Sequence, residues 1–198
     1  MSQREVLPRP QGMLKWIIRR KLAAFERTYG YDAAYMRDLL DTDLGAFMTF
    51  ARACKLGQYR KDVPREVWMA ASMVSIVHED CGPCTQLGVT LALAEGVDAK
   101  VIAAVLAGDR ERMSPAVRLG VDFAKATIAH APEVDELREQ IVARWGKRAV
   151  VALAFAVLAS RLYPTVKYAL GYGKACQRIT VEGQVIPIDR GAVAEHAA

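Results

Sequence analysis

The stretch PREVWMAASMVSIVHEDCGPCTQLGVTLALAEGV, residues 64–97, decides the fold prediction. Ala, Met, Val and Leu dominate both halves, and Pro64 stands where the first turn of a helix tolerates proline. Pro83 interrupts the pattern, because proline lacks the N–H of a helical hydrogen bond and pushes the preceding residue out of the helical region. We therefore predict one helix that ends near Glu79 and a second that runs from about Pro83 to Glu95.

A Cys-x-x-Cys motif lies at this break. Cys81 and Cys84 flank Gly82 and Pro83, so both thiols fall at or inside the first turn of the second helix. A thiol at a helix N-terminus ionises more readily, because unpaired N–H groups and the helix dipole stabilise the thiolate. One thiolate can then attack a peroxide or a disulfide, and the other thiol can resolve the product. The motif predicts a redox pair.

Two polar residues before the motif extend the candidate site. His78 lies three residues before Cys81 and can relay a proton if the first helix extends that far. Glu79 and Asp80 place negative charge beside the thiol, which disfavours the thiolate, unless they serve to hold His78 in the required tautomer. The candidate catalytic residues are therefore Cys81, Cys84, His78 and Glu79, and we expect neither a cofactor nor a bound metal.

Two other interpretations of the cysteine pair stay open. In a metal site, His78, Cys81 and Cys84 would be ligands spaced three residues apart, but structural zinc requires four ligands. The remaining candidates are distant in the sequence: Cys54, His130, Cys176 and His196. Alternatively the pair is structural, and the protein is a helical scaffold or ligand binder whose thiols are incidental.

Other enzyme classes find little support in the sequence. The tetrapeptide CGPC also occurs at the thioredoxin active site, but there it follows a strand of a mixed sheet, and this sequence shows no alternation of strands and helices around the motif. The chain has no Gly-x-Ser-x-Gly elbow and no glycine-rich phosphate loop. We therefore keep the prediction of dithiol redox chemistry and reject the thioredoxin fold.

The rest of the chain predicts an all-α protein. Helical patterns cover residues 13–29, 32–40, 42–56, 114–130, 132–145 and 147–171. Only the segment RITVEGQVIPI alternates as a strand does, which predicts a short hairpin around Glu182 and Gly183. We divide the chain into an arm over 1–12, a helical domain over 13–177 and a tail over 178–198.

Two helices carry unusual apolar patterns. The run AVVALAFAVLA, residues 149–159, is shorter than the roughly 20 residues of a bilayer span, so we expect a helix buried on every side, in the core or at a subunit contact. The first helix places Leu14, Ile17, Ile18, Leu22 and Phe25 on one face and basic residues beside them. We expect this face to pack on its own protein rather than on a membrane.

Composition bounds the function and the compartment. A chain of 198 residues that is 53% hydrophobic and 25% charged suits one globular domain with a core, and a net charge of +5 is too small to indicate nucleic-acid binding. No signal-peptide pattern opens the sequence, so we expect a cytoplasmic protein, where thiols stay reduced and paired cysteines usually have redox or metal-binding roles.

A faint internal repeat suggests two related helical halves. Arg65 and Arg148 each precede an apolar helix and lie 83 residues apart, and the same offset separates Gly88 from Gly171. Two coincidences in a sequence so rich in Ala, Val and Leu can also arise by chance.

Residues 64–171 resemble the carboxymuconolactone decarboxylase and AhpD-like family, through the quoted stretch and the later VRLGVDFAKATIAHAP and LREQIVARWGKRAVVALAFAVLAS. The resemblance implies a small all-α domain, a redox pair at Cys81 and Cys84, peroxide or disulfide substrates, a thiol electron donor and assembly into homotrimers or hexamers. AhpD-like members carry a histidine four residues after the second cysteine, where this chain has Gly88. AhpD-like members also carry a glutamate twelve residues before the first cysteine, where this chain has Met69.

Overall fold

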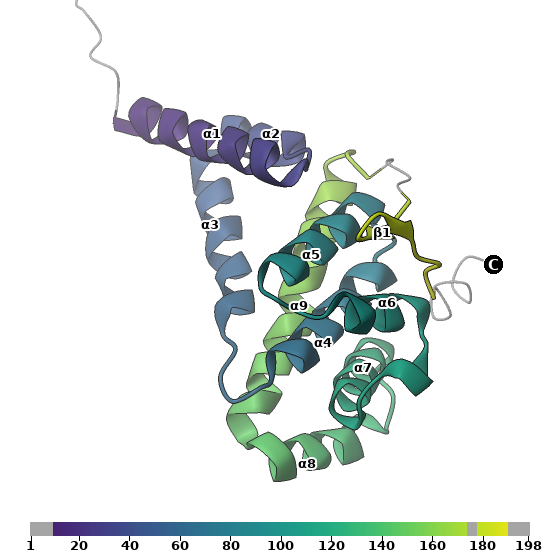
Figure 1. Ribbon diagram of the computed structural model, residues 1–198. Coiled ribbons are helices and arrows are strands. Elements are labelled where there is room, and N and C mark those ends of the chain that lie inside the picture. The colour runs from purple at the N-terminus through teal and green to yellow at the C-terminus, as the bar shows by residue number, and fades with distance from the viewer. Residues whose placement is uncertain (1–9, 174–177, 190–198) are drawn as a thin grey trace, which may run out of the picture. The chain divides into compact units, whose positions relative to one another are not determined.

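The computed structural model of the chain describes residues 10–173 and 178–189. In these residues it has nine α-helices, two short 3-10 helices and one two-stranded sheet, which confirms the predicted all-α class (Figure 1). The chain separates into two compact units, Met1–Ala53 and Cys54–Ala198, and this boundary lies inside the predicted 13–177 domain. Most of the predicted arm, the end of the predicted tail, Cys176 and His196 lie outside the described residues.

The first unit contains α1 (Pro10–Tyr29), α2 (Ala34–Thr42) and most of α3 (Leu44–Cys54). Gly30 has φ of +61°, a conformation that suits glycine, and it ends α1 as the sequence predicts. The Glu26 carboxylate then accepts hydrogen bonds from the backbone N–H of Ala33, at 2.9 Å, and from the Arg37 guanidinium. These contacts join the end of α1 to the start of α2.

Within the first unit the apolar face of α1 is only partly covered, and the prediction that this face packs on its own protein stays a prediction. Leu22 is buried and Ile18 and Phe25 are half-buried, but Leu14 and Ile17 are 40% and 38% exposed. The reason is length: α2 has nine residues against the twenty of α1. The N-terminal half of α1 therefore presents an apolar face that α2 leaves uncovered.

The second unit contains most of the helices and the sheet. Its elements are η1 (Lys55–Gln58), α4 (Arg65–His78), α5 (Gly82–Ala94), α6 (Ala99–Ala107), η2 (Arg110–Arg112), α7 (Pro115–Ala129), α8 (Val134–Trp145), α9 (Lys147–Ala169), β1 (Thr180–Val181) and β2 (Gln184–Val185). The predicted cap at Ser114 is confirmed, because its hydroxyl accepts a hydrogen bond from the backbone N–H of Val117 at 3.2 Å.

Helix α4 lies between two hydrophobic clusters. Met69 and Met73 join a cluster built with α5, α6 and the hairpin, while Val67 and Ala71 join a second cluster with α7, α8 and α9. Figure 1 shows α4 among these helices. An apolar helix with little polar surface, as the sequence of α4 predicts, suits a position that is buried on two sides.

The predicted hairpin is present and packs on α5. Thr180 pairs with Val185 and Val181 with Gln184, and the two residues between the strands, Glu182 and Gly183, both have positive φ. Val181 is buried in the same cluster as Met73 of α4. Residues of the described part of the tail thus belong to the core beside the cysteine-bearing helix.

Within the single chain, helix α9 is buried on one side, and the predicted burial of its other side at a subunit contact stays a prediction. Its Ala149, Ala152 and Leu153 are fully buried, but Val151 and Leu158 are 42% and 49% exposed. Buried residues thus occupy only one side of the helix. By length and hydropathy α9 is also the one helix in the described part of the chain that is long and apolar enough to cross a membrane.

The internal repeat suggested by the 83-residue offset in the sequence does not join equivalent helices or turns in the structure. The break between α4 and α5 at residues 79–81 corresponds at this spacing to residues 162–164, which lie inside α9. Gly88 lies in the middle of α5, whereas Gly171 follows the end of α9 with φ of +84°. The structure therefore gives the proposed halves no common pattern of helices at this offset.

Candidate functional site

The turn between α4 and α5 places the cysteines as the sequence predicts. Helix α4 ends at His78, Asp80 has φ of +49°, and Cys81 is the extended N-cap residue of α5. Pro83 is in the first turn, where its missing N–H leaves no helical hydrogen bond unmade. Cys84 follows directly in that turn, so the prediction that both thiols lie at the start of the second helix is confirmed.

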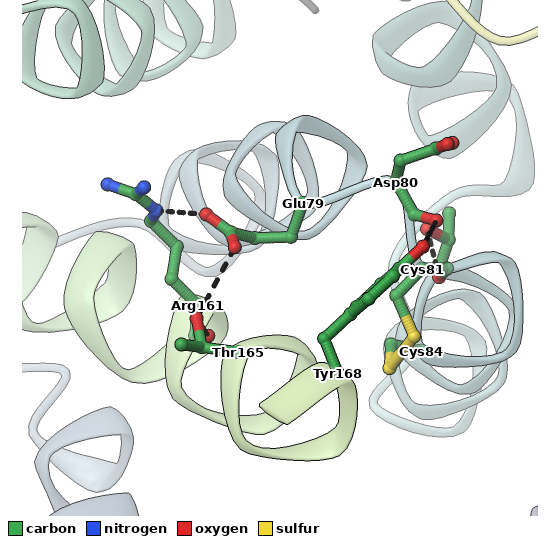
Figure 2. Close-up of a disulfide and its surroundings, with 8 residues drawn as sticks. Glu79, Asp80, Cys81, Cys84, Arg161, Thr165 and Tyr168 are labelled. Atoms are coloured by element: carbon green, nitrogen blue, oxygen red, sulfur yellow. Dashed lines mark hydrogen bonds and ion pairs between the residues drawn. A yellow bond between two sulfur atoms is a disulfide. The ribbon is translucent and has the colours of Figure 1, made fainter. Parts of the chain in front are cut away.

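The sulfurs of Cys81 and Cys84 form a disulfide, with 5.3 Å between their Cα atoms (Figure 2). This Cα separation lies within the range that a disulfide requires, because the Gly-Pro turn brings the two side chains to the same side. The proximity needed for reversible bond formation is therefore present in the fold.

Both cysteines are buried. Cys81 is 3% exposed and Cys84 is 6% exposed. The adjacent Thr85 is buried as well, and both its backbone N–H and its hydroxyl donate to the carbonyl oxygen of Cys81, at 2.9 and 3.1 Å. These bonds fix the first turn of α5. The N-terminal N–H groups of α5 supply the positive potential that favours a thiolate once the disulfide is reduced.

Glu79 connects this turn to α9. Its carboxylate accepts a hydrogen bond from Nε of Arg161 at 2.5 Å and another from the Thr165 hydroxyl at 3.3 Å (Figure 2). The Glu79 side chain is only 17% exposed, so the ion pair is partly shielded from water. His78 is half-buried at the last position of α4. The proposed role of Glu79 as a partner of His78 stays a prediction.

Tyr168 of α9 reaches the same turn. Figure 2 shows its side chain extending toward the backbone of Asp80 and Cys81, and its hydroxyl lies 3.5 Å from the carbonyl oxygen of Asp80. Beyond the end of α9, Gly173 packs directly on the ring, since a Cβ at that position would lie 2.4 Å from Cδ1 of Tyr168. A side chain at position 173 would therefore displace the ring.

Sequence reasoning missed the contribution of α9 to the site. Arg161, Thr165 and Tyr168 follow a spacing of i, i+4 and i+7, which places three polar side chains on one face of α9, after its apolar run. That pattern is the signal that could have identified them. The partner of Arg161 is Glu79, 82 residues earlier, and no sequence pattern indicates that these two residues form a pair.

Gln86 connects the cysteine-bearing helix to the hairpin. Its side-chain nitrogen donates to the carbonyl oxygen of Thr180 at 3.0 Å, and its side-chain oxygen accepts from the backbone N–H of Thr180 at 2.8 Å. The amide thus pairs with one backbone residue as a neighbouring strand would. It fixes β1 beside the first two turns of α5.

The two positions at which AhpD-like members carry relay residues are apolar here. Met69 is buried in the cluster around α4. A Cβ on Gly88 would lie 3.2 Å from Cδ1 of Ile76 and 3.6 Å from Sδ of Met73, so α4 and α5 approach closely at this point. Glu66, the nearest carboxylate to Met69 in the sequence, is exposed in the first turn of α4.

The remaining cysteine and histidine candidates lie apart from this turn or outside the described residues. Cys54 is half-buried at the end of α3, and burial raises its thiol pKa while a hydrogen bond with Tyr163 opposes that shift. His130 is the exposed C-cap residue of α7, at the negative end of the helix as expected. No group of three or more His, Cys, Asp or Glu side chains within residues 10–173 and 178–189 is arranged to hold a metal.

Comparisons with known proteins leave the family open. No protein-family model, curated protein or solved structure matches the chain.

Proposed function

We propose that the protein is a thiol-dependent oxidoreductase that reduces peroxides or disulfides through Cys81 and Cys84. The observation that supports this function is the position of the pair, with both sulfurs within bonding distance at the N-terminus of α5. A helix N-terminus favours the thiolate, and a neighbouring thiol allows the oxidised product to be resolved within one chain. The cytoplasmic location expected from the sequence would supply the reducing conditions.

The proposed reaction with a peroxide has three steps. One thiolate attacks the O–O bond, so an S–O bond forms, the O–O bond breaks, and an alcohol or water leaves after taking up a proton. The second thiol then attacks the resulting sulfenic acid, which forms the Cys81–Cys84 disulfide and releases water. A dithiol donor reduces this disulfide through a mixed disulfide, and the donor is oxidised as both protein thiols are restored.

His78 is the proposed proton relay, because the structure places it at the end of α4, three residues before Cys81. Replacing it with alanine should slow peroxide consumption by on the order of a hundredfold if it transfers the proton. A variant with unchanged helical content and an unchanged rate would remove His78 from the site.

Membership of the AhpD-like family is part of the proposal. It is supported by the all-α class and by a Cys-x-x-Cys that begins a helix. The absence of the family's relay residues at Met69 and Gly88 argues for a different route for the proton. A homo-oligomer, trimeric or hexameric as in the family, follows only if the resemblance holds.

A turnover assay on the full chain tests the redox function. Dithiothreitol serves as the donor, and hydrogen peroxide, an organic hydroperoxide and a small aromatic disulfide serve as substrates. We expect Cys81→Ser and Cys84→Ser each to abolish turnover and Cys54→Ser to retain it. Equal rates for all three variants would show that the pair has no part in the reaction.

The second candidate function is a non-redox helical oligomer, lactone-decarboxylase-like or ligand-binding, whose thiols are incidental. The burial of both cysteines favours it, because little of either residue is open to a substrate. In that case Cys81→Ser and Cys84→Ser would leave the activity and the oligomer unchanged. Size-exclusion chromatography with light scattering, under reducing conditions, measures the mass of the oligomer.

A further inference from the structure

The structure leaves one basic, apolar surface of α1 without a partner in its own unit. We propose that this surface, formed by Met13, Leu14, Trp16, Ile17, Arg20 and Lys21, docks on an anionic lipid membrane. This inference is independent of the redox function and departs from the expectation, based on the sequence, that α1 buries its apolar face on its own protein.

Four large apolar side chains form the first part of this surface. Met13, Leu14, Trp16 and Ile17 are 65%, 40%, 56% and 38% exposed. They lie in the N-terminal part of α1, where Lys15 and Arg19 contact Asp41 of α2 but these four apolar side chains stay exposed. Large apolar side chains that cluster on an exposed surface are unusual in a soluble protein and indicate a binding face.

Basic side chains continue the same face. Arg20 lies one turn after Trp16, with its guanidinium carbon 5.1 Å from the centre of the indole ring, and Lys21 lies one turn after Ile17. Both Arg20 and Lys21 are exposed. Residues 10–25 contain no acidic residue. Within α1 the apolar patch is therefore bordered by positive charge alone, and Asp41 of α2, whose carboxylate contacts this part of α1, is paired with Arg19.

Three acidic side chains of this unit contact groups other than Arg20 and Lys21. Asp41 of α2 accepts a hydrogen bond from Arg19 at 2.6 Å, and Asp43 accepts one from the first turn of α3 at 2.5 Å. Glu26 binds Arg37 and the backbone of Ala33. These contacts leave the positive charge of Arg20 and Lys21 on the outer face.

Charge and hydrophobicity together select an anionic lipid surface as the occupant. A second copy of the chain would bring the same basic residues face to face, which like-charge repulsion opposes. A nucleic acid would satisfy the cations but gives apolar side chains no apolar environment. At a membrane, Trp16 can lie at the interface, Met13 and Ile17 can enter the acyl boundary, and Arg20 and Lys21 can extend to lipid phosphates.

A vesicle flotation experiment tests the proposal with the full chain. We expect binding to vesicles of equal parts phosphatidylcholine and phosphatidylglycerol, and little binding to phosphatidylcholine alone. Replacing both Arg20 and Lys21 with glutamine should weaken binding by about thirtyfold. Each basic residue near an anionic surface strengthens binding by roughly five- to sixfold, and the two factors multiply. Replacing both Trp16 and Ile17 with alanine should weaken it by more than tenfold.

A matched variant controls for the loss of charge. Lys61→Gln combined with Lys100→Gln removes two exposed cations from the second unit and should bind like the wild type. Circular dichroism checks that every variant keeps its helical content. The proposal fails if the wild type does not bind anionic vesicles, if the control loses as much binding as the α1 variants, or if those variants instead dissociate an oligomer in solution.

Discussion

The carboxylate of Glu79 accepts a hydrogen bond from the guanidinium of Arg161 at 2.5 Å, although the two residues lie 82 positions apart in the sequence. Glu79 precedes Cys81 by two residues in the cysteine-bearing turn, and Arg161 belongs to α9, the longest helix in the described residues. This contact gives α9 a direct connection to the candidate site. It also assigns Glu79 a role in holding the turn, which the sequence did not indicate.

We expect the Glu79–Arg161 pair to contribute to stability. A double-mutant cycle with alanine at both positions should give a coupling of about 1 kcal/mol in chemical denaturation, at the upper end for a partly exposed charged pair. The pair Asp62–Arg148, at 2.6 Å but with both side chains more exposed than Glu79, is the matched control and should give about half as much or less. Equal couplings would show that the shielding of Glu79 has no effect.

Gly120 of α7 should tolerate no side chain. A Cβ there would lie 2.7 Å from Cγ1 of Val67 and 2.9 Å from its carbonyl oxygen, and the backbone of α4 cannot move away cheaply. Gly120→Ala should lower the free energy of unfolding by about 3 kcal/mol.

Gly88→Ala is the control for this prediction. Its new methyl group would meet only the flexible ends of Ile76 and Met73, and alanine favours the helix, so the change in unfolding free energy should stay within about 1 kcal/mol. Urea unfolding followed by circular dichroism measures both variants. A Gly120→Ala protein as stable as the wild type would contradict the close contact between α4 and α7.

The pH dependence of the first unit should depend on Glu26. Its hydrogen bond with the Arg37 side chain holds the pKa of the carboxyl below the ordinary 4.5, although burial opposes the shift. Because the folded pKa lies below the unfolded one, the stabilisation is present above about pH 4.5 and is lost as the pH falls through the folded pKa.

Thermal melts between neutral and acidic pH test this linkage. Glu26→Gln should lower stability at neutral pH and flatten its decline below pH 4.5, whereas the exposed Glu139→Gln should leave the wild-type profile unchanged. If the melting temperature of the Glu26→Gln protein falls as steeply with acidification as that of the wild type, the Glu26 carboxylate is not the cause of the pH dependence.

Cys54 should react slowly with alkylating reagents. Burial raises the pKa of its thiol, and the opposing hydrogen bond with Tyr163 is the smaller effect, so less thiolate is present at neutral pH than in a free cysteine. Iodoacetamide should therefore label Cys54 more slowly in the folded protein than in the chain unfolded by urea at the same pH. Mass spectrometry of timed samples gives the two rates, and equal rates would contradict the effect of burial.

The sequence was sufficient where a local rule decides the backbone. Pro83 interrupts the helix by its chemistry, so the break, the start of α5 and the position of both thiols were predictable. Ser114 was predictable as a cap, and Gly183 as part of a tight turn, for similar local reasons.

The missed features depend on contacts that are distant in the sequence. Nothing local to Glu79 indicates that Arg161 would bind it, or that Gln86 would pair with Thr180. Burial depends on such contacts as well: Ile17 of α1 is exposed within its own unit, and Leu158 of α9 is exposed within the single chain. Periodicity identifies an apolar face and does not say how far a partner extends along it.

The chemistry of the Cys81–Cys84 pair in solution is the most direct test of the account. Mass spectrometry of the reduced full chain after mild peroxide should show a single intramolecular Cys81–Cys84 disulfide, which dithiothreitol reverses. Two thiols that stay free under these conditions, or that oxidise only when the protein is unfolded, would contradict the proposed redox function.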